Sequence, residues 1–275
     1  MNCRTDLAIE IEENIQKTEK ESQKIGNIIV EFTTLNPNNS YKKPSGKYAS
    51  VHIGKIEFLT SFEDVEKSIF LCLEKLLPKK RESVLVVGLG NREIISDCVG
   101  PFTAEKILAT RHIVGDFADK IGLKGLKSVS VITPSVLGKT GIEAAEIVLS
   151  IVKKIKPDAV IVIDALCAKK PENLFSVIQL CDSGISPGSG VKNARKELSF
   201  NTLGVPTVAI GVPTVVEAQS LMGNCFDGRE EKFENLLLTP KDTDLLSHRI
   251  SEILSTSINL FLQPETQKDL LLSLV

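Results

Sequence analysis

The chain has 275 residues, of which 42% are hydrophobic and 25% are charged, as in an ordinary globular protein with a large core. Its 33 basic and 35 acidic residues give a formal net charge of -2, without the basic excess that is typical of direct nucleic-acid binding. The first residues lack the apolar core of a signal peptide and no apolar run is long enough to cross a bilayer, so we expect a cytoplasmic protein with no membrane partner.

The first part of the chain predicts two helices and two strands. Residues 9–24 are rich in Glu and Lys with interspersed isoleucines, which favours a helix. Apolar, β-prone runs predict strands at 28–32 and 48–53, and apolar residues at helical spacing predict a second helix over 65–77. We expect residues 7–80 to form an N-terminal appendage and the first elements of a single domain.

Strands and helices alternate over residues 81–275, which we expect to hold the core of the sheet and the last helix. Strands are predicted at 84–87, 129–132, 159–163, 176–180 and 207–210, and helices near Pro101, over 141–155 and after Thr239-Pro240-Lys241-Asp242. This alternation predicts an α/β fold in which a mostly parallel central sheet is flanked by helices on both faces.

Two aspartates follow predicted strands and are the strongest candidates for chemistry. Asp97 comes shortly after the strand at 84–87, and Asp164 directly follows the apolar run 159–163. The carboxyl ends of strands in an open α/β sheet face the ligand crevice, where two carboxylates can share a proton and activate a water molecule. The simpler alternative is that each aspartate caps a helix or lies in a surface loop. An acid that follows five apolar residues nevertheless needs a partner or a raised pKa.

Several familiar motifs are incomplete. The turn Gly88-Leu89-Gly90-Asn91 begins like a dinucleotide fingerprint, but Glu93 stands at the third glycine position. Gly184-Ile185-Ser186-Pro187-Gly188 matches the nucleophile elbow of serine hydrolases, yet Pro187 has no N–H to donate to an oxyanion hole. Lys139 lacks the rest of a P-loop, the six cysteines form no C-x-x-C pair, and zinc-binding spacing is absent around the three histidines, His52, His112 and His248.

Taken together, the motifs resemble the germination protease family of spore-forming bacteria. The stretches that carry the resemblance are Cys3-Arg4-Thr5-Asp6-Leu7-Ala8, Gly88-Leu89-Gly90-Asn91, Ser96-Asp97-Cys98-Val99-Gly100-Pro101, and residues 133–141, 163–166, 182–191 and 202–216. The resemblance implies an endopeptidase that starts the degradation of small acid-soluble spore proteins during germination, in the cytoplasm of the forespore and the spore core. It also implies a homotetramer, and a fold similar to that of hydrogenase maturation endopeptidases.

The same resemblance implies an aspartic-type site with Asp97 and Asp164 as catalytic residues. Members of the family are made as inactive precursors that remove a short N-terminal segment. The stretch Thr5-Asp6-Leu7-Ala8 fits the processing pattern of a Thr or Ser, an acid, an apolar residue and Ala. We therefore expect residues 1–6 to be a propeptide that is cut between Asp6 and Leu7 and that lies in or near the cleft of the precursor.

Mechanistically, one aspartate would be ionised and accept a proton from water, while the other would be protonated and polarise the scissile carbonyl. Asn91 and Ser189 are candidate donors to the developing oxyanion. We expect no cofactor and no metal. Two alternatives stay open from the residues: a metal-dependent maturation endopeptidase, and a non-catalytic module whose Gly- and Ser-rich segment at 184–190 binds a phosphate or a peptide.

Overall fold

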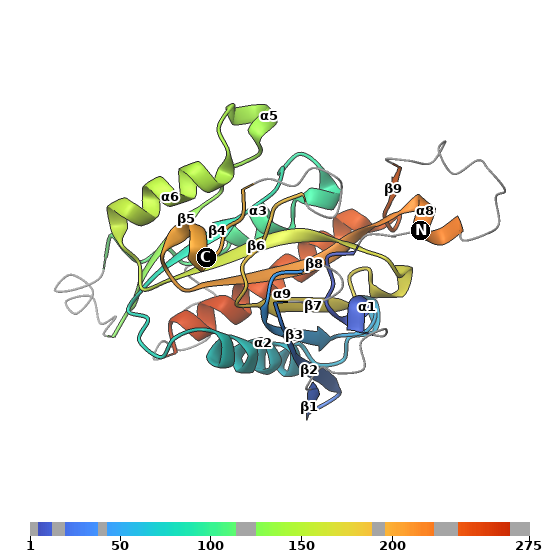
Figure 1. Cartoon of the computed structure of the whole chain (residues 1–275). Coiled ribbons are helices and arrows are strands. Elements are labelled where there is room, and N and C mark those ends of the chain that lie inside the picture. Colours follow the sequence, from blue (N-terminus) through green and yellow to red (C-terminus); the bar gives the residue numbers. More distant parts are fainter. Residues whose placement is uncertain are drawn as a thin grey trace.

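The computed structural model describes residues 5–12, 20–37, 43–113, 125–188, 196–222 and 236–264 (Figure 1). Its strands are β1 (Lys20–Ile25), β2 (Ile28–Leu35), β3 (Gly46–His52), β4 (Ser83–Gly88), β5 (Ser128–Ile132), β6 (Ala159–Ala168), β7 (Val177–Cys181), β8 (Thr207–Glu217) and β9 (Leu237–Leu238). Its helices are α1 (Ile9–Glu12), α2 (Phe62–Leu76), α3 (Val99–Glu105), α5 (Leu137–Thr140), α6 (Ala144–Ile155), α7 (Phe200–Leu203), α8 (Ala218–Met222) and α9 (Thr243–Leu262), with short 3-10 turns at Ile56–Phe58, Ile95–Asp97 and Pro171–Asn173.

All the strands join one sheet in the order β1-β2-β3-β7-β8-β6-β4-β5, and β9 adds to the end of β8. The neighbours β5, β4, β6 and β8 run parallel to one another. The strands β1, β2, β3 and β7 pair antiparallel, as do β7 with β8 and β8 with β9. The predicted α/β fold with a central sheet between helices is confirmed, while the sheet itself is mixed, with its parallel pairing confined to one half.

The N-terminal part of the chain supplies the antiparallel half. Strand β3 pairs with β7, so residues expected to form an appendage are built into the main sheet. The predicted helix over 9–24 is wrong beyond Glu12 for the described residues, because 20–25 form β1. This exposed edge strand is joined to β2 through a turn at Gly26, whose φ of +56° suits glycine. Its charged side chains protect a sheet edge from further pairing.

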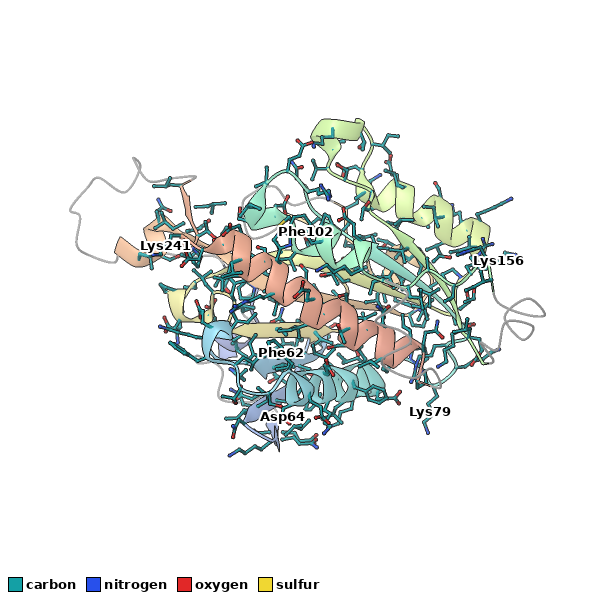
Figure 2. The ribbon with its side chains drawn as sticks, turned by 180° about the vertical axis from the view of Figure 1, so that it is seen from behind. Phe62, Asp64, Lys79, Phe102, Lys156 and Lys241 are labelled. Carbon is teal, nitrogen blue, oxygen red and sulfur yellow. The ribbon has the colours of Figure 1, made fainter. Side chains whose placement is uncertain are left out.

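One face of the sheet is covered by α2 and α9, which lie side by side across it (Figure 2). Helix α2 begins at Phe62 because the Ser61 hydroxyl accepts the N–H of Asp64 at 3.2 Å. The apolar stripe predicted for the last helix is buried here, as Leu246, Ile250, Ile253 and Leu254. None of the helices in the described part of the chain has the length and apolar character needed to span a bilayer.

The opposite face is covered in two parts. Helix α6 packs over the parallel half against alternate residues of β4 and β6, such as Val87 and Val162. Residues of the N-terminal segment cover the strands nearer the antiparallel half: Leu7 contacts Leu166, and Ala8 packs with β3, β7 and β8. The N-terminal segment therefore lies on the same face of the sheet as α6.

Candidate active site

Asp164 lies inside strand β6 and not after it, because β6 extends to Ala168. The neighbouring strand β4 ends at Gly88, which pairs with Ile163, so Asp164 still lies at the edge where the parallel strands end. Its side chain has the parity of Val160 and Val162 and therefore faces the α6 side of the sheet. The residue is only 6% exposed, and its Oδ1 accepts the N–H of Ala165 at 2.9 Å.

Asp97 reaches the same edge through the turn that follows β4. The chain turns at Gly90, whose φ is +115°, and returns through the 3-10 turn Ile95–Asp97. The backbone N–H of Asn91 donates to Oδ2 of Asp97 at 2.7 Å and fixes the carboxylate. Cys98 occupies the N-cap position of α3. The expected alternative, in which Asp97 caps that helix, is thus replaced by a contact across the turn.

Two glycines allow α3 to press against the strand ends. A Cβ on Gly100 would lie 2.1 Å from the carbonyl oxygen of Leu89 and 2.5 Å from that of Ile163. A Cβ on Gly88 would lie 2.3 Å from the carbonyl oxygen of Gly100. Any larger residue at either position would push α3 outward. This close packing sets the position of Asp97, which lies just before α3, relative to Asp164.

The two predicted acids line one cleft of roughly 280 Å³. Its walls come from the turn after β4, from β6, and from residues 185–188, with Ser135 and Val136 at the start of α5. The lining is more apolar than polar, with Leu89, Ile94, Leu166 and Val215 among its residues. Carboxylates that are far apart in the sequence are therefore brought into a single cavity that can hold part of a peptide.

Asp6 brings a third carboxylate to the wall of this cleft. Its Oδ2 accepts the N–H of Cys167 at 2.9 Å, and Nζ of Lys43 lies 3.7 Å from its Oδ1. Its backbone N–H donates to the carbonyl oxygen of Cys167, also at 2.9 Å. The next residue, Leu7, is fully buried. The N-terminal segment is thus docked against the end of β6, three residues beyond Asp164.

Glu10 anchors the far end of this segment. Its carboxylate is 6% exposed and accepts the N–H groups of Lys169 at 2.7 Å and Lys170 at 2.8 Å. It also accepts the side-chain amide of Asn173 at 2.7 Å and the hydroxyl of Thr5. Because a buried carboxylate without partners is costly, these donors hold the segment in place along the cleft.

Comparison with known proteins identifies the family. The family model described as Germination protease matches residues 4–228. The germination protease of Clostridium acetobutylicum is 36% identical and that of Clostridium tetani 37% identical, each over 96% of this chain and 96% of the relative. The germination protease of Geobacillus sp. (strain WCH70) is 42% identical over 82% of this chain and 67% of the relative. The chain belongs to the germination protease family.

A solved structure, the NiFe hydrogenase maturation protease of Thermococcus kodakarensis KOD1, is 16% identical. The match covers 68% of this chain and 98% of that one, and the TM-score is 0.40. Membership of the germination protease family makes this chain a peptidase of spore germination.

The two predicted oxyanion donors have different outcomes in this member of the germination protease family. Asn91 is not among the described residues that line the cleft; its side-chain oxygen accepts the N–H of Glu93 at 3.1 Å, and its backbone N–H holds Asp97. Ser189 lies outside the described residues. The backbone N–H of Asn91 therefore positions the carboxylate of Asp97, and the role of its side-chain amide as an oxyanion donor stays a prediction.

A serine, a histidine and a cysteine are further candidates for a nucleophile or a metal ligand in the described part of this germination protease family member. Ser186 lines the cleft, but His248 stacks on Phe102 with the ring centroids 4.5 Å apart and does not line it. Burial, with the nearby charges of Asp6 and Glu217, raises the pKa of the Cys167 thiol to about 12, so this thiol stays protonated and unreactive at neutral pH. Among the described residues, no three His, Cys, Asp or Glu side chains are grouped to hold a metal ion.

Sequence reasoning missed two residues that contact the N-terminal segment beside the predicted cut. Lys43 approaches the carboxylate of Asp6. Gln179, in β7, donates from Nε2 to the backbone carbonyl of Asp6 at 3.1 Å and accepts the N–H of Ala8 at Oε1 at 2.6 Å. Neither lies in a recognisable motif, and only the pairing of β3, β7 and β8 brings them to this segment.

Proposed function

We propose that this chain is the endopeptidase that starts the degradation of small acid-soluble spore proteins during germination, and that Asp97 and Asp164 are its catalytic residues. The observation that carries the proposal is that both carboxylates line one cleft, together with the acid that precedes the predicted processing site. The proposed setting is the cytoplasm of the forespore and the spore core, in keeping with the family.

In the proposed mechanism the two carboxylates act as a pair. One is ionised and takes a proton from a water molecule in the cleft, and the other is protonated and donates to the oxygen of the scissile carbonyl. A mechanism in which two carboxylates share one proton assigns the roles to the pair and not to either residue alone. The apolar walls of the cleft strengthen these charge interactions by excluding water.

The proposed function includes self-processing between Asp6 and Leu7. Two observations support it: Asp6 lines the cleft that holds both acids, and Leu7 and Ala8 are buried in separate hydrophobic clusters. The contacts of Lys43 and the Cys167 N–H with the carboxylate of Asp6 give a physical reason for an acid before the cut bond. The docked segment would also keep the precursor inactive, because it occupies the position that a substrate would take in the cleft.

The decisive experiment is isosteric removal of either charge. Asp164→Asn and Asp97→Asn should each abolish both self-processing and cleavage of a purified small acid-soluble spore protein, because an amide cannot accept the proton of water. The matched control is Asp244→Asn, which changes an exposed aspartate in the first turn of α9 and should keep wild-type rates. Mass spectrometry of the products, with circular dichroism to show folding, reads the outcome. A fully active Asp164→Asn enzyme would remove the proposal.

The same assay separates the alternative functions. A pair of carboxylates that shares a proton needs no metal, so we expect EDTA to leave the cleavage rate unchanged. Loss of activity in EDTA that a divalent ion restores would favour a metal-dependent maturation endopeptidase. Association with a spore protein without cleavage would favour a binding module. The proposed homotetramer is tested separately by light scattering of the purified chain.

A further inference from the structure

Gln179 makes an unusual pair of contacts with the main chain of the N-terminal segment. Its side chain is 6% exposed, and both ends of its amide group are used. The Nε2 group donates to the carbonyl oxygen of Asp6 at 3.1 Å, and Oε1 accepts the N–H of Ala8 at 2.6 Å. One buried amide therefore spans the peptide bond between Asp6 and Leu7 and holds the main chain on both sides of it.

The sheet places Gln179 in register with Asp164. In β8, Gly211 pairs with Asp164 of β6 on one side and with Gln179 of β7 on the other. Residues that are directly opposite in neighbouring strands project from the same face. Gly211 adds no side chain between them, and the space above it is filled by Leu166, which would lie 2.3 Å from a Cβ at this position. Leu166 in turn contacts Leu7.

The remaining polar groups of this peptide are also engaged. The N–H of Leu7, which belongs to the bond between Asp6 and Leu7, donates to the hydroxyl of Thr5 at 3.0 Å. The N–H of Asp6 donates to Cys167 at 2.9 Å. Gln179 donates to the carbonyl oxygen of Asp6. It is a neutral donor, so it can bind the oxygen without changing the ionisation of a carboxylate pair.

We propose that Gln179 is a catalytic residue that grips the main chain of the substrate, holding the scissile carbonyl oxygen with Nε2 and the N–H two residues further along with Oε1. The inference rests on the proposed function, in which Asp6–Leu7 is the bond that is cut. The hydrogen bonds of Gln179 to the main chain fix which peptide bond lies at the site, independently of the side chains of the substrate. The contacts of Lys43 and of the Cys167 N–H favour an acidic residue on the N-terminal side of the cut bond.

The chemistry gives Gln179 a larger effect in the transition state than in the ground state. Water adds to the carbonyl carbon of Asp6 as its proton passes to the carboxylate pair, and the carbonyl oxygen gains negative charge. The C–N bond to Leu7 then breaks, and its nitrogen takes up the proton that the carboxylate pair received from water, which leaves a carboxyl group on Asp6 and a free amine on Leu7. The Nε2 donor strengthens its hydrogen bond as the charge develops, and loss of one such donor slows catalysis by roughly 100- to 1000-fold.

Self-processing of the full chain under first-order conditions tests this inference. Gln179→Met keeps most of the volume and removes both contacts, so its cut between Asp6 and Leu7 should be about 100- to 1000-fold slower than in the wild type. The matched control is Gln263→Met. Gln263 is 2% exposed and likewise bridges main-chain groups, accepting the N–H of Lys127 at 2.9 Å and donating to its carbonyl at 3.0 Å, but these groups do not belong to the N-terminal segment. Its rate should stay close to that of the wild type.

A second variant keeps the test informative if Gln179→Met does not fold. Gln179→Glu is nearly isosteric, but its ionised form has no donor for the oxyanion, whereas its protonated form has one. The ratio of its rate to the wild-type rate should therefore rise as the pH falls through the pKa of the introduced carboxyl group. A residue that only supports the fold would not give this recovery.

The outcomes are distinct from those that test the proposed function. A wild-type chain that never cuts between Asp6 and Leu7, or an Asp164→Asn chain that still does, overturns the proposed function. If the wild type cuts there and Asp164→Asn does not, then wild-type rates in both Gln179 variants overturn only the inference about Gln179. The inference about Gln179 is also overturned by a second combination of results. In that case Gln263→Met cuts as slowly as Gln179→Met, and the rate of Gln179→Glu relative to the wild type does not change with pH.

Discussion

The anchor at Glu10 controls how tightly the N-terminal segment is docked. Replacing Glu10 by Gln keeps the shape of the side chain but gives one of its two oxygen positions to an NH₂ group. Each oxygen accepts a backbone N–H, from Lys169 or from Lys170, so in either orientation one backbone donor loses its acceptor. A buried donor without a partner costs about 1–3 kcal/mol, and hydrogen bonds to a charged group contribute about 1.5–3 kcal/mol.

We therefore expect a loss of about 1–3 kcal/mol of docking free energy, which corresponds to roughly 5- to 150-fold more frequent opening of the segment. Hydrogen–deuterium exchange measures this opening, because Leu7 and Ala8 donate their N–H groups within the docked segment. The experiment uses the Asp164→Asn background, which should not cut itself if the proposed function holds. In the Glu10→Gln chain, a peptide covering residues 5–12 should exchange faster by this factor.

Glu172→Gln is the control for the Glu10 experiment. Glu172 is exposed and lies in the 3-10 turn Pro171–Asn173, next to the residues that hold Glu10. Replacing Glu172 removes one negative charge, as replacing Glu10 does, but it leaves the contacts of Glu10 intact. Hydrogen–deuterium exchange of residues 5–12 should therefore be the same as in the Asp164→Asn chain. Unchanged exchange in Glu10→Gln would refute the reasoning, because it would mean that the other contacts of the segment hold it without the anchor at Glu10.

Two further predictions follow from the packing. Gly100→Ala should lower the melting temperature and reduce the cleavage rate at least 10-fold. The reason is that its Cβ would meet the carbonyl oxygens of Leu89 and Ile163, and overpacking of this kind costs about 1–3 kcal/mol. In the control Gly138→Ala a Cβ meets nothing within 4 Å, so neither the melting temperature nor the cleavage rate should change. Burial raises the pKa of the Cys72 thiol from 9.0 to about 12 in the folded chain. The unfolded chain therefore loses this proton at a lower pH than the folded chain does. As a result, the free energy of unfolding should fall by up to about 1.4 kcal/mol per pH unit above pH 9. Urea denaturation of Cys72→Ala, which lacks the thiol, should show a smaller alkaline loss than the wild type, and equal losses would contradict the assignment.

Local sequence predicts the elements well where burial and hydrogen bonding are local. The central strands are confirmed because their apolar runs are buried on both faces of the sheet, and α9 is confirmed because its apolar stripe repeats at helical spacing. Strand β1 could not be predicted, since residues 20–25 carry mainly charged and polar side chains and become a strand only by pairing with β2. The predicted end of the strand at residue 163 is also wrong. The apolar run stops before Asp164, but strand β6 continues through Asp164 to Ala168.

The two acids could be proposed from sequence because each follows an apolar run that predicts the same edge of the sheet. Their shared cleft depends on Gly88 and Gly100, whose lack of a side chain is visible in sequence but whose contacts are not. Gln179, Lys43 and Glu10 give no signal of their own, because their roles arise from the N-terminal segment that folds back onto the sheet. Their contacts belong to the tertiary structure, so no spacing rule could have found them.

The docked segment links the two parts of the site in a single physical argument. The parallel half of the sheet supplies Asp164 and, through the turn after β4, Asp97, whereas the antiparallel half supplies Gln179. Gln179 and Asp164 lie in one row of the sheet on either side of Gly211 of β8, and Gln179 holds the main chain of the N-terminal segment there. The mixed sheet therefore does more than support a cleft: its parallel half carries the acids, and its antiparallel half holds the peptide that they are proposed to cut.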